Sequence, residues 1–229
     1  MLEKLTQQEF SNATARTIVR SLLSVFRKRR STRHFDQAPI DIEIIKMAVA
    51  IAGTAPSGAN KQPWSFAIIQ EQELKSAIRQ KAEEEESLFY AERAPQKWLR
   101  DLEPLHTDAT KEFLTEASYL IPIFYATFDV DAQGAKSTHY YAKESVGIAT
   151  GLLIAALHLA GLSVLTYTPS NRRFMTRLLN RQENENAFLV LAVGLPHPEA
   201  RVPQLSKKTL SDILTIYKNV SERNSTIET

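Results

Sequence analysis

The stretch Ser145–Asn171, SVGIATGLLIAALHLAGLSVLTYTPSN, contains no Asp, Glu, Lys or Arg and is the most apolar part of the chain. Its segment Ile148–Leu165 is long enough to cross a membrane. However, the segment includes His158 and two hydroxyl side chains, and it has no flanking anchors. A helix that is apolar all round is more often a core or subunit-interface helix. We therefore expect an internal helix that gives way to a strand over Leu162–Thr168.

Helical and strand-like patterns alternate on both sides of this stretch. Helix periodicity marks residues 8–28, Asp41–Ile51, Glu71–Arg93 and Arg172–Leu179. Strands are expected at Trp64–Ile69, Tyr119–Phe128 and Ala187–Val193, whereas residues 94–113 lack a clean period and Asp129–Lys136 has the composition of a loop. The alternation predicts an α/β or α+β class. A length of 229 residues favours one domain, 1–229, with a mobile polar tail over about 218–229.

Composition excludes several kinds of site. The chain has no cysteine, and its seven glycines form no G-x-G-x-x-G, G-x-x-x-x-G-K-S/T or G-x-S-x-G motif. The five histidines lack metal-ligand spacing, which argues against a metal site. A net charge of +2 gives no general argument for binding nucleic acid or a membrane. The first residues lack a secretory pattern, so we expect a cytoplasmic protein.

Five basic side chains lie within residues 27–33. If the backbone is extended there, Arg29, Ser31 and Arg33 point the same way. Two guanidinium groups and a hydroxyl on one face would suit a phosphate. Two alternatives remain open: a solvated helix C-terminus, and a patch that binds nucleic acid or another anion.

The segment Thr54–Trp64, TAPSGANKQPW, has the composition of a turn-rich loop. Such a loop offers many backbone N–H groups and can line a planar polar ligand. The alternative is an ordinary surface loop with Trp64 in the core.

The run Glu83–Glu86 places four carboxylates on a helix, and we expect Glu83 to Glu85 to form a solvated face. Glu86 differs because Tyr90 follows it at i+4 on the same face of the helix. Lys111 lies beyond the aperiodic stretch. By itself this trio is weak support for a site, because such pairs occur on most helices.

Four stretches, taken in order and spacing, resemble the FMN-dependent nitroreductase superfamily and, within it, the iodotyrosine deiodinase branch. They are Arg29-Arg-Ser-Thr-Arg33, Ala55-Pro-Ser-Gly-Ala-Asn-Lys-Gln-Pro-Trp64, His139-Tyr-Tyr-Ala-Lys-Glu-Ser-Val-Gly-Ile-Ala149 and Thr166-Tyr-Thr-Pro169. The resemblance extends from about Phe26 to Ile216. It implies an α+β nitroreductase-like fold with a central, mainly antiparallel sheet flanked by helices. It also implies an intertwined homodimer, with the long apolar helix in the dimer core and an FMN at each interface site.

The resemblance also implies which residues hold FMN. The phosphate, ribityl chain and ring edge are assigned to Arg29, Arg30, Ser31 and Arg33, with Lys207 completing the phosphate site. The partner subunit contributes the loop residues Pro56, Ser57, Gly58 and Asn60. Thr166, Tyr167 and Thr168 lie along the isoalloxazine ring, and the Thr168 hydroxyl lies near its N5 atom as the catalytic group.

The substrate end of the resemblance rests on Glu86, Tyr90 and Lys111. The deiodinase branch has Glu-x-x-x-Tyr and a Lys twenty-one residues after that Tyr, the interval from Tyr90 to Lys111 here. In that branch these residues lie on a lid, here about 84–113, and hold the amino-acid end of the substrate. The backbone N–H at Ala59 holds the substrate phenolate. General nitroreductases lack this trio.

The chain departs from the branch at Ala109, where Trp is common, at Asn60, where some deiodinases have His, and at Lys207, where vertebrate relatives have Arg. The activity implied is reductive dehalogenation of a halotyrosine such as 3-iodotyrosine, with NAD(P)H as a possible electron donor. One alternative is a general NAD(P)H-dependent nitro- or quinone-reductase, and another is the branch that converts its own flavin to a benzimidazole. From another class, the chain could be a nucleic-acid- or anion-binding module. For a dehalogenase of this kind we expect no metal site and no binding to nucleic acid or a membrane.

Overall fold

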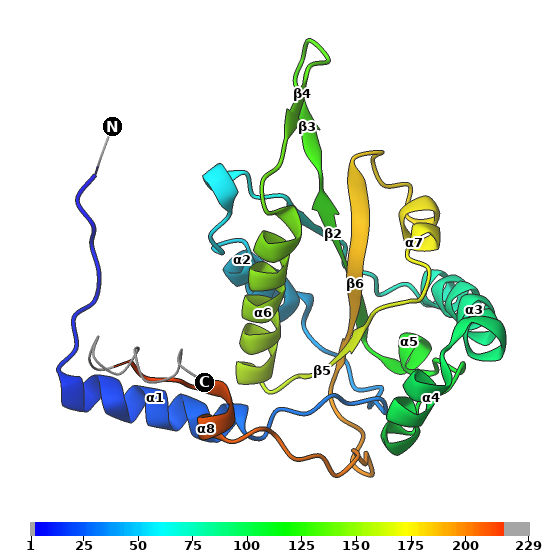
Figure 1. Cartoon of the computed structure of the whole chain (residues 1–229), viewed down its shortest axis with the longest axis horizontal. Helices are drawn as coiled ribbons and strands as arrows, with labels where there is room; N and C mark the ends of the chain where they lie inside the picture. Colours follow the sequence, from blue (N-terminus) through cyan, green and yellow to red (C-terminus); the bar gives the residue numbers. More distant parts are fainter. Residues whose placement is uncertain (1–2, 218–229) are drawn as a thin grey trace, which may run out of the picture.

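The computed structural model describes residues 3–217, so the tail expected to be mobile, 218–229, lies outside the described residues. A four-stranded sheet runs through the body of the protein in the order β1-β2-β6-β5 (Figure 1). Every neighbouring pair in it is antiparallel. The strands are β1 (Trp64–Phe66), β2 (Tyr119–Ala126), β5 (Ser163–Tyr167) and β6 (Glu185–Gly194). The α+β class with a mainly antiparallel sheet is thereby confirmed.

Alternate residues of the central strands enter two separate cores, one on each face of the sheet. On β2, Leu120 and Phe124 belong to one core, together with Tyr167, while Ile121 and Ile123 belong to the other. Because both faces are covered, β2 is apolar throughout rather than alternating, and residues Tyr119 to Phe124 are all buried.

Helices cover the two faces from opposite sides (Figure 1). The face with Ile121 and Ile123 packs against α2 (Ile42–Ala52) and α6 (Ala142–Leu159). The face with Leu120 and Phe124 packs against α3 (Gln72–Leu88), α5 (Phe113–Glu116) and α7 (Arg173–Leu178). Among the described residues, α6 is the helix long and apolar enough to cross a membrane. It instead packs on α2 and the sheet through one face, as expected for a core helix, and leaves Ile148 and Leu159 exposed on another.

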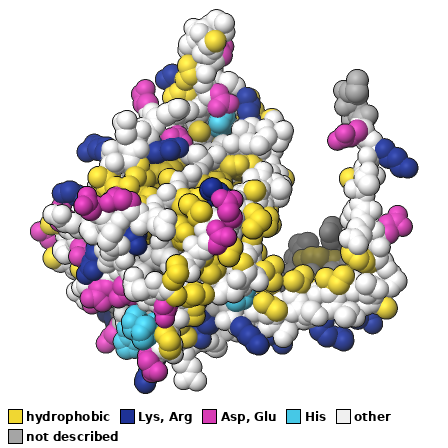
Figure 2. Space-filling view, turned by 180° about the vertical axis from the view of Figure 1, so that it is seen from behind, with side chains coloured by type: hydrophobic (Ala, Val, Ile, Leu, Met, Phe, Trp, Pro, Cys, Tyr) yellow, Lys and Arg dark blue, Asp and Glu magenta, His cyan; other side chains and the backbone are white. Residues whose placement is uncertain are grey.

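The first helix, α1 (Asn12–Phe26), projects from the body (Figure 1), and the last described helix is the short α8 (Leu210–Ile213). No side chain of α1 is buried against the described part of the chain. Its C-terminal end is attached to α6, because the Nε2 of His158 lies 3.0 Å from the carbonyl oxygen of Val25. Hydrophobic side chains gather along the edge of α1 that faces the body, and basic ones along the other edge (Figure 2). The helix therefore presents an apolar face that the described part of its own chain does not cover.

Two regions differ from the sequence-based expectation. The predicted loop Asp129–Lys136 is the tip of a projecting hairpin formed by β3 (Phe128–Val130) and β4 (Lys136–Thr138). One carboxylate oxygen of Asp131 accepts hydrogen bonds from the backbone N–H groups of Gln133 and Ala135, which closes the turn. The aperiodic stretch 94–113 contains α4 (Gln96–Leu102) and a short 3-10 turn, η3 (Glu103–Leu105). These helical segments are too short to give a recognisable helical period in the sequence.

Candidate active site

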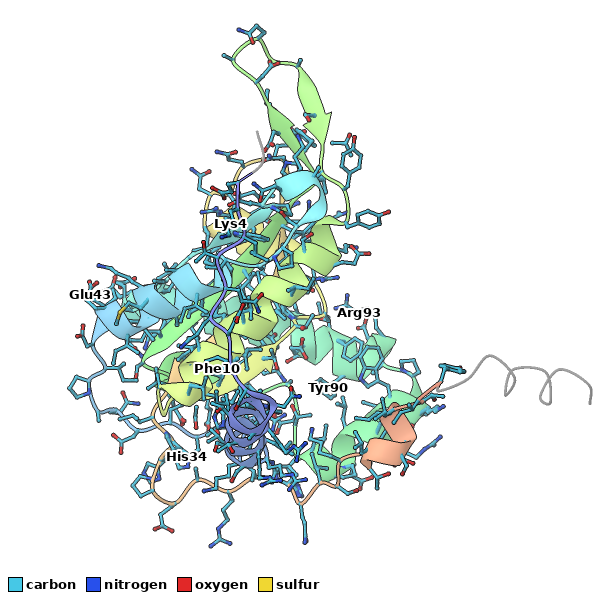
Figure 3. All side chains as sticks on the ribbon, turned by 90° about the vertical axis from the view of Figure 1, so that its left-hand side faces the viewer. Lys4, Phe10, His34, Glu43, Tyr90 and Arg93 are labelled. Atoms are coloured by element: carbon cyan, nitrogen blue, oxygen red, sulfur yellow. The ribbon has the colours of Figure 1, made fainter. Side chains whose placement is uncertain are left out.

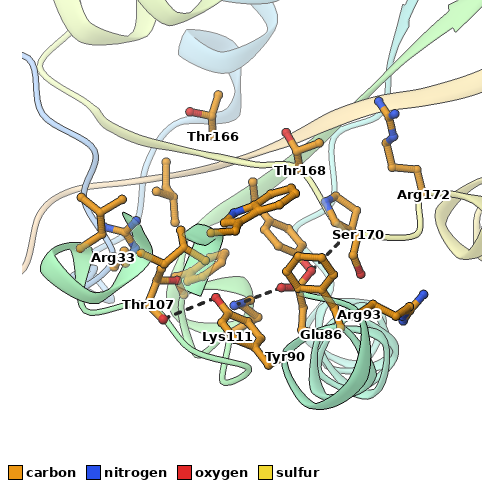
Figure 4. A pocket seen from close by; sticks show the side chains of 18 residues that line it. Arg33, Glu86, Tyr90, Arg93, Thr107, Lys111, Thr166, Thr168, Ser170 and Arg172 are labelled. Atoms are coloured by element: carbon orange, nitrogen blue, oxygen red, sulfur yellow. Dashed lines mark hydrogen bonds and ion pairs between the residues drawn. The ribbon is translucent and has the colours of Figure 1, made fainter. Parts of the chain in front are cut away.

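A pocket of about 640 Å³ opens between β5, the loop that follows it, and the lid segment (Figure 4). It collects predicted cofactor residues and predicted substrate residues in one place: Arg33, Glu86, Tyr90, Lys111, Thr166, Tyr167 and Thr168. Trp98 and Leu102 of α4 also line it. The two ends of the lid, at Glu86 and Lys111, and its middle, at Trp98 and Leu102, therefore line the same pocket.

The helix that carries Glu86 changes geometry just before Tyr90. α3 ends at Leu88 and continues as a π-helical turn, η2 (Phe89–Arg93). Single π turns occur frequently at functional sites. The Tyr90 hydroxyl donates to the carbonyl oxygen of Thr107 at 3.4 Å. This contact joins η2 to the linker that carries Lys111.

Glu86 and Lys111 form a buried ion pair. Their side chains approach at 3.6 Å between Oε2 and Nζ, and the residues are 7% and 3% exposed, respectively. The Lys111 ammonium lies 5.5 Å from the centroid of the Tyr90 ring and also donates to the carbonyl oxygen of Asp108. Opposite charges with little water around them can bind a ligand that carries both signs.

The surroundings shift the pKa values of several groups in this pocket, among them Lys111, Tyr90 and Arg33. Burial lowers the pKa of Lys111, and the nearby Glu86 carboxylate opposes that shift. Burial also raises the pKa of Tyr90, with the Glu86 charge adding to the increase, and burial lowers the pKa of Arg33. The pocket is therefore a partly dehydrated environment in which charged side chains depend on one another.

The prediction of a solvated face for Glu83 to Glu85 was wrong for two of the three. Glu83 accepts a 2.7 Å hydrogen bond from the backbone N–H of Lys111 and a 2.8 Å bond from Arg79 Nε. Glu85 accepts a 3.0 Å bond from the Asn171 amide. Glu84 has a surface pair with Lys81 at 2.6 Å, as expected of a solvated carboxylate. Lys111 and Asn171 come from distant parts of the chain, so these contacts of Glu83 and Glu85 gave no signal in the local sequence.

The predicted flavin residues of the segment Arg29–Arg33 lie beside the outer edge of β5. Ser31 forms an isolated parallel bridge with Val164, which places the basic segment beside this strand. Arg33 lines the main pocket, whereas Arg29 and Arg30 line a separate hollow of about 210 Å³. Within this segment Ser31 pairs with the sheet, and the common face of Arg29, Ser31 and Arg33 stays a prediction. The Arg30 guanidinium donates to the carbonyl oxygen of Pro203, four residues before the exposed Lys207.

Burial alternates at the end of β5 and at Thr168, the residue that follows the strand. Thr166 and Thr168 are exposed, and Tyr167 between them is buried. The two threonine side chains project from one side of the strand, and Glu86, Tyr90 and Lys111 lie on the other side (Figure 4). Because β5 is the last strand of the sheet, a ligand along its free edge has access to both sides.

The loop with Pro56, Ser57, Gly58, Ala59 and Asn60 lies apart from this pocket. It follows α2, and Glu43 of α2 lies on the opposite side of the body from Tyr90 and Arg93 (Figures 1 and 3). Ala59 and Asn60 have φ angles of 50° and 52°, a conformation that costs free energy and is found most often at functional sites. A Cβ on Gly58 would lie 2.8 Å from the Tyr140 carbonyl oxygen, so glycine is needed there.

Comparison with known proteins identifies the class. Residues 26–195 match the Nitroreductase family, and the chain belongs to this family. Its curated relatives include the iodotyrosine deiodinase of Haliscomenobacter hydrossis, 46% identical over 189 residues that cover 82% of this chain and 85% of the relative. The iodotyrosine deiodinase of Nematostella vectensis is 42% identical over 191 residues, covering 83% and 72%.

Solved structures agree with this placement. A crystal structure of oxidized iodotyrosine deiodinase bound to FMN and 3-iodo-L-tyrosine superposes with a TM-score of 0.72 at 28% identity, covering 86% of this chain and 98% of that chain. A BluB-like flavoprotein from Clostridium difficile superposes with a TM-score of 0.64 at 19% identity, covering 86% and 99%, which shows a shared fold. The predicted family and its deiodinase branch are thereby confirmed as the group this chain resembles.

Proposed function

We propose that this protein is an FMN-dependent oxidoreductase that removes halogen reductively from halotyrosines such as 3-iodotyrosine. The observation that carries the proposal is the buried Glu86–Lys111 pair, which shares a pocket with Thr166 and Thr168 of β5. The similarity to iodotyrosine deiodinases over most of the chain supports the same activity.

The residues present fit FMN. Strand β5 offers two exposed hydroxyls, Thr166 and Thr168, and the segment bridged to its edge offers the guanidinium of Arg33. Arg29, Arg30 and Ser31 would hold the phosphate end, with Lys207 beside them. Bound and reduced FMN supplies the electrons. The Thr168 hydroxyl would act on the flavin as a hydrogen-bond donor.

The chain's own charges recognise the substrate. The ammonium of a halotyrosine binds Glu86, and its carboxylate binds Lys111 and the Tyr90 hydroxyl. Charge-assisted hydrogen bonds of this kind set orientation as well as affinity. Trp98 and Leu102, on the lid, cover the ring and exclude water. The Ala59 N–H, from a second subunit, holds the phenolate.

The reaction replaces the carbon–halogen bond of the ring with carbon–hydrogen. It consumes two electrons and one proton, and it releases halide. No thiolate takes part, because the chain has no cysteine. NAD(P)H, acting through the flavin, is the proposed source of the electrons, and the reaction is proposed to take place in the cytoplasm.

A homodimer completes this site. One face of α6 presents exposed Ile148 and Leu159. A Cβ added at Gly151 would meet no atom of the described residues outside its own helix turn within 4 Å. The loop at 56–60 lies away from the pocket of its own chain (Figure 1). Packing α6 against its copy would cover the apolar face and bring this loop to the partner's flavin.

The test uses the purified protein, which should be yellow. Anaerobic addition of 3-iodotyrosine to the dithionite-reduced holoenzyme should yield tyrosine and iodide in equal amounts. Unchanged 3-iodotyrosine would refute the proposed reaction. Reduction of nitroaromatics or quinones that is insensitive to Glu86→Ala and Lys111→Ala, without dehalogenation, would identify a general reductase instead.

A further inference from the structure

The two oxygens of the Glu86 carboxylate have different partners. Oε1 accepts a 3.3 Å hydrogen bond from the Tyr167 hydroxyl and a 3.1 Å bond from the backbone N–H of Ser170. Oε2 lies 3.6 Å from the Lys111 ammonium. Oε1 is therefore held by Tyr167 and Ser170, whereas Oε2 faces the Lys111 ammonium and is available to a cationic group of a ligand.

Tyr167 is itself fixed in place. The residue is 7% exposed, and its ring meets the Phe113 ring edge-on, with centroids 5.6 Å apart and planes at 69°. The Lys111 ammonium lies 6.0 Å from the Tyr167 ring centroid. Burial and the Glu86 charge raise the pKa of Tyr167, so its hydroxyl stays protonated and remains a donor.

The alternation of β5 separates Tyr167 from its neighbours. Successive side chains of a strand leave opposite faces, and here Thr166 and Thr168 are exposed while Tyr167 is buried towards the lid. Thr166 and Thr168 face the side proposed for the flavin. The Tyr167 side chain therefore makes a contact with the lid in addition to the cofactor contact that the sequence resemblance assigned to this residue.

We propose that Tyr167 is a positioning residue that fixes the Glu86 carboxylate, so that Oε2 is presented to the ammonium of the substrate. The hydrogen bond also joins strand β5, which carries Thr168, to the lid. A neighbouring contact reinforces the connection, because the Asn171 amide donates to Glu85 at 3.0 Å. This inference rests on the proposed function, since it assigns a role in binding the same substrate.

The experiment compares Tyr167→Phe with Tyr119→Phe in the FMN-loaded protein. Tyr119 is a matched control: it is 1% exposed, and its hydroxyl donates to the Ile40 carbonyl oxygen at 2.7 Å, away from the pocket. Two ligands are titrated, 3-iodotyrosine and 2-iodophenol, which has the same iodinated ring without the amino-acid end.

Tyr167→Phe should weaken 3-iodotyrosine binding about tenfold, the usual value of one hydrogen bond to a charged acceptor. It should leave the affinities for 2-iodophenol and FMN unchanged, as should Tyr119→Phe. In a Glu86→Gln background the same change should have little further effect, because the two residues act as a unit. Equal weakening of both ligands, loss of FMN, or additivity with Glu86→Gln would overturn the inference.

A second measurement separates this inference from the proposed function. If the wild-type protein binds no 3-iodotyrosine, the proposed function fails, and amide hydrogen exchange of the ligand-free protein decides the role of Tyr167. Faster exchange over residues 84–93 in Tyr167→Phe than in Tyr119→Phe supports the positioning role. Equal exchange in the two variants overturns it.

Discussion

The lid pocket and the loop at 56–60 are built in opposite ways. In the pocket, Glu86 and Lys111 are buried, and each of them is already paired within one chain. The loop has exposed residues in the left-handed region, and α6 leaves Ile148 and Leu159 exposed among the described residues. A single chain thus supplies the residues proposed to bind the amino-acid end of the substrate. The proposed flavin contacts of the loop require a second copy of the chain. Substitutions in the pocket should therefore reduce substrate specificity, and substitutions at the α6 face should reduce dimerisation.

The broadest effect, on assembly and cofactor together, should come from breaking the exposed apolar face of α6. Ile148→Glu places a charge where the proposed dimer buries apolar surface, and an unpaired buried charge is strongly unfavourable. We expect monomers by light scattering and at least a tenfold loss of bound FMN, about 1.4 kcal/mol or more. Leu178→Glu on α7 makes the same change on another exposed residue and should alter neither. A dimer that keeps its flavin after Ile148→Glu would contradict the interface.

The next effect should come from breaking the pocket. Lys111→Ala leaves Glu86 buried without its cation, and loss of one partner of a buried charge pair should weaken 3-iodotyrosine binding about a hundredfold. FMN content and dimerisation should stay at wild-type values. Lys81→Ala removes an exposed lysine that pairs with Glu84 and serves as the control. Isothermal titration measures both, and equal losses in the two variants would refute a specific role for Lys111.

The pH dependence of binding sharpens the same contrast. Burial lowers the pKa of Lys111, so its ammonium is lost at a lower pH than that of an exposed lysine, which titrates near 10.4. Since the charged form binds the carboxylate, affinity should fall with rising pH once this pKa is passed. Lys111→Arg keeps its charge. The wild-type Kd divided by that of Lys111→Arg should therefore rise by up to about tenfold per pH unit on the alkaline limb.

That ratio cancels the titration of the substrate's own ammonium and phenol, because both proteins bind the same ligand. A ratio that stays constant with pH would show that Lys111 does not titrate in the accessible range.

The smallest effect should come from Glu83. Its carboxylate holds the backbone N–H of Lys111, so Glu83→Ala should displace the lysine and raise KM about fivefold, with kcat little changed. Glu84→Ala, one residue further along, removes a surface carboxylate and should change KM less than twofold. Equal values of KM for the two variants would show that the bond to Lys111 has no effect on binding.

Much of this architecture could be predicted from the sequence. The uncharged stretch from Ser145 predicted α6 and β5, and the buried apolar run at Tyr119 predicted β2. Glu86, Tyr90 and Lys111 could be named as a trio from their spacing and resemblance, and the fold brings them into one pocket.

Other features depend on tertiary contacts and gave no local signal. Glu83 and Glu84 lie in the same run of four glutamates, and the return of the chain at Lys111 gives Glu83 a partner that Glu84 lacks. Likewise, a common face for Arg29, Ser31 and Arg33 could be suggested only on the condition of an extended backbone, and no local signal in the sequence marked the isolated bridge between Ser31 and Val164. The orientation of Tyr167 towards Glu86 depended on which face of β5 the lid covers.

The central claim is that Glu86 and Lys111 select the amino-acid end of a halotyrosine. Its most direct test is the ratio of kcat/KM for 3-iodotyrosine to kcat/KM for 2-iodophenol, measured in wild type and in Glu86→Ala. The wild-type ratio should be large and should fall about a hundredfold in the variant, since 2-iodophenol has no ammonium for Glu86 to bind. A ratio that is unchanged by Glu86→Ala would contradict the account.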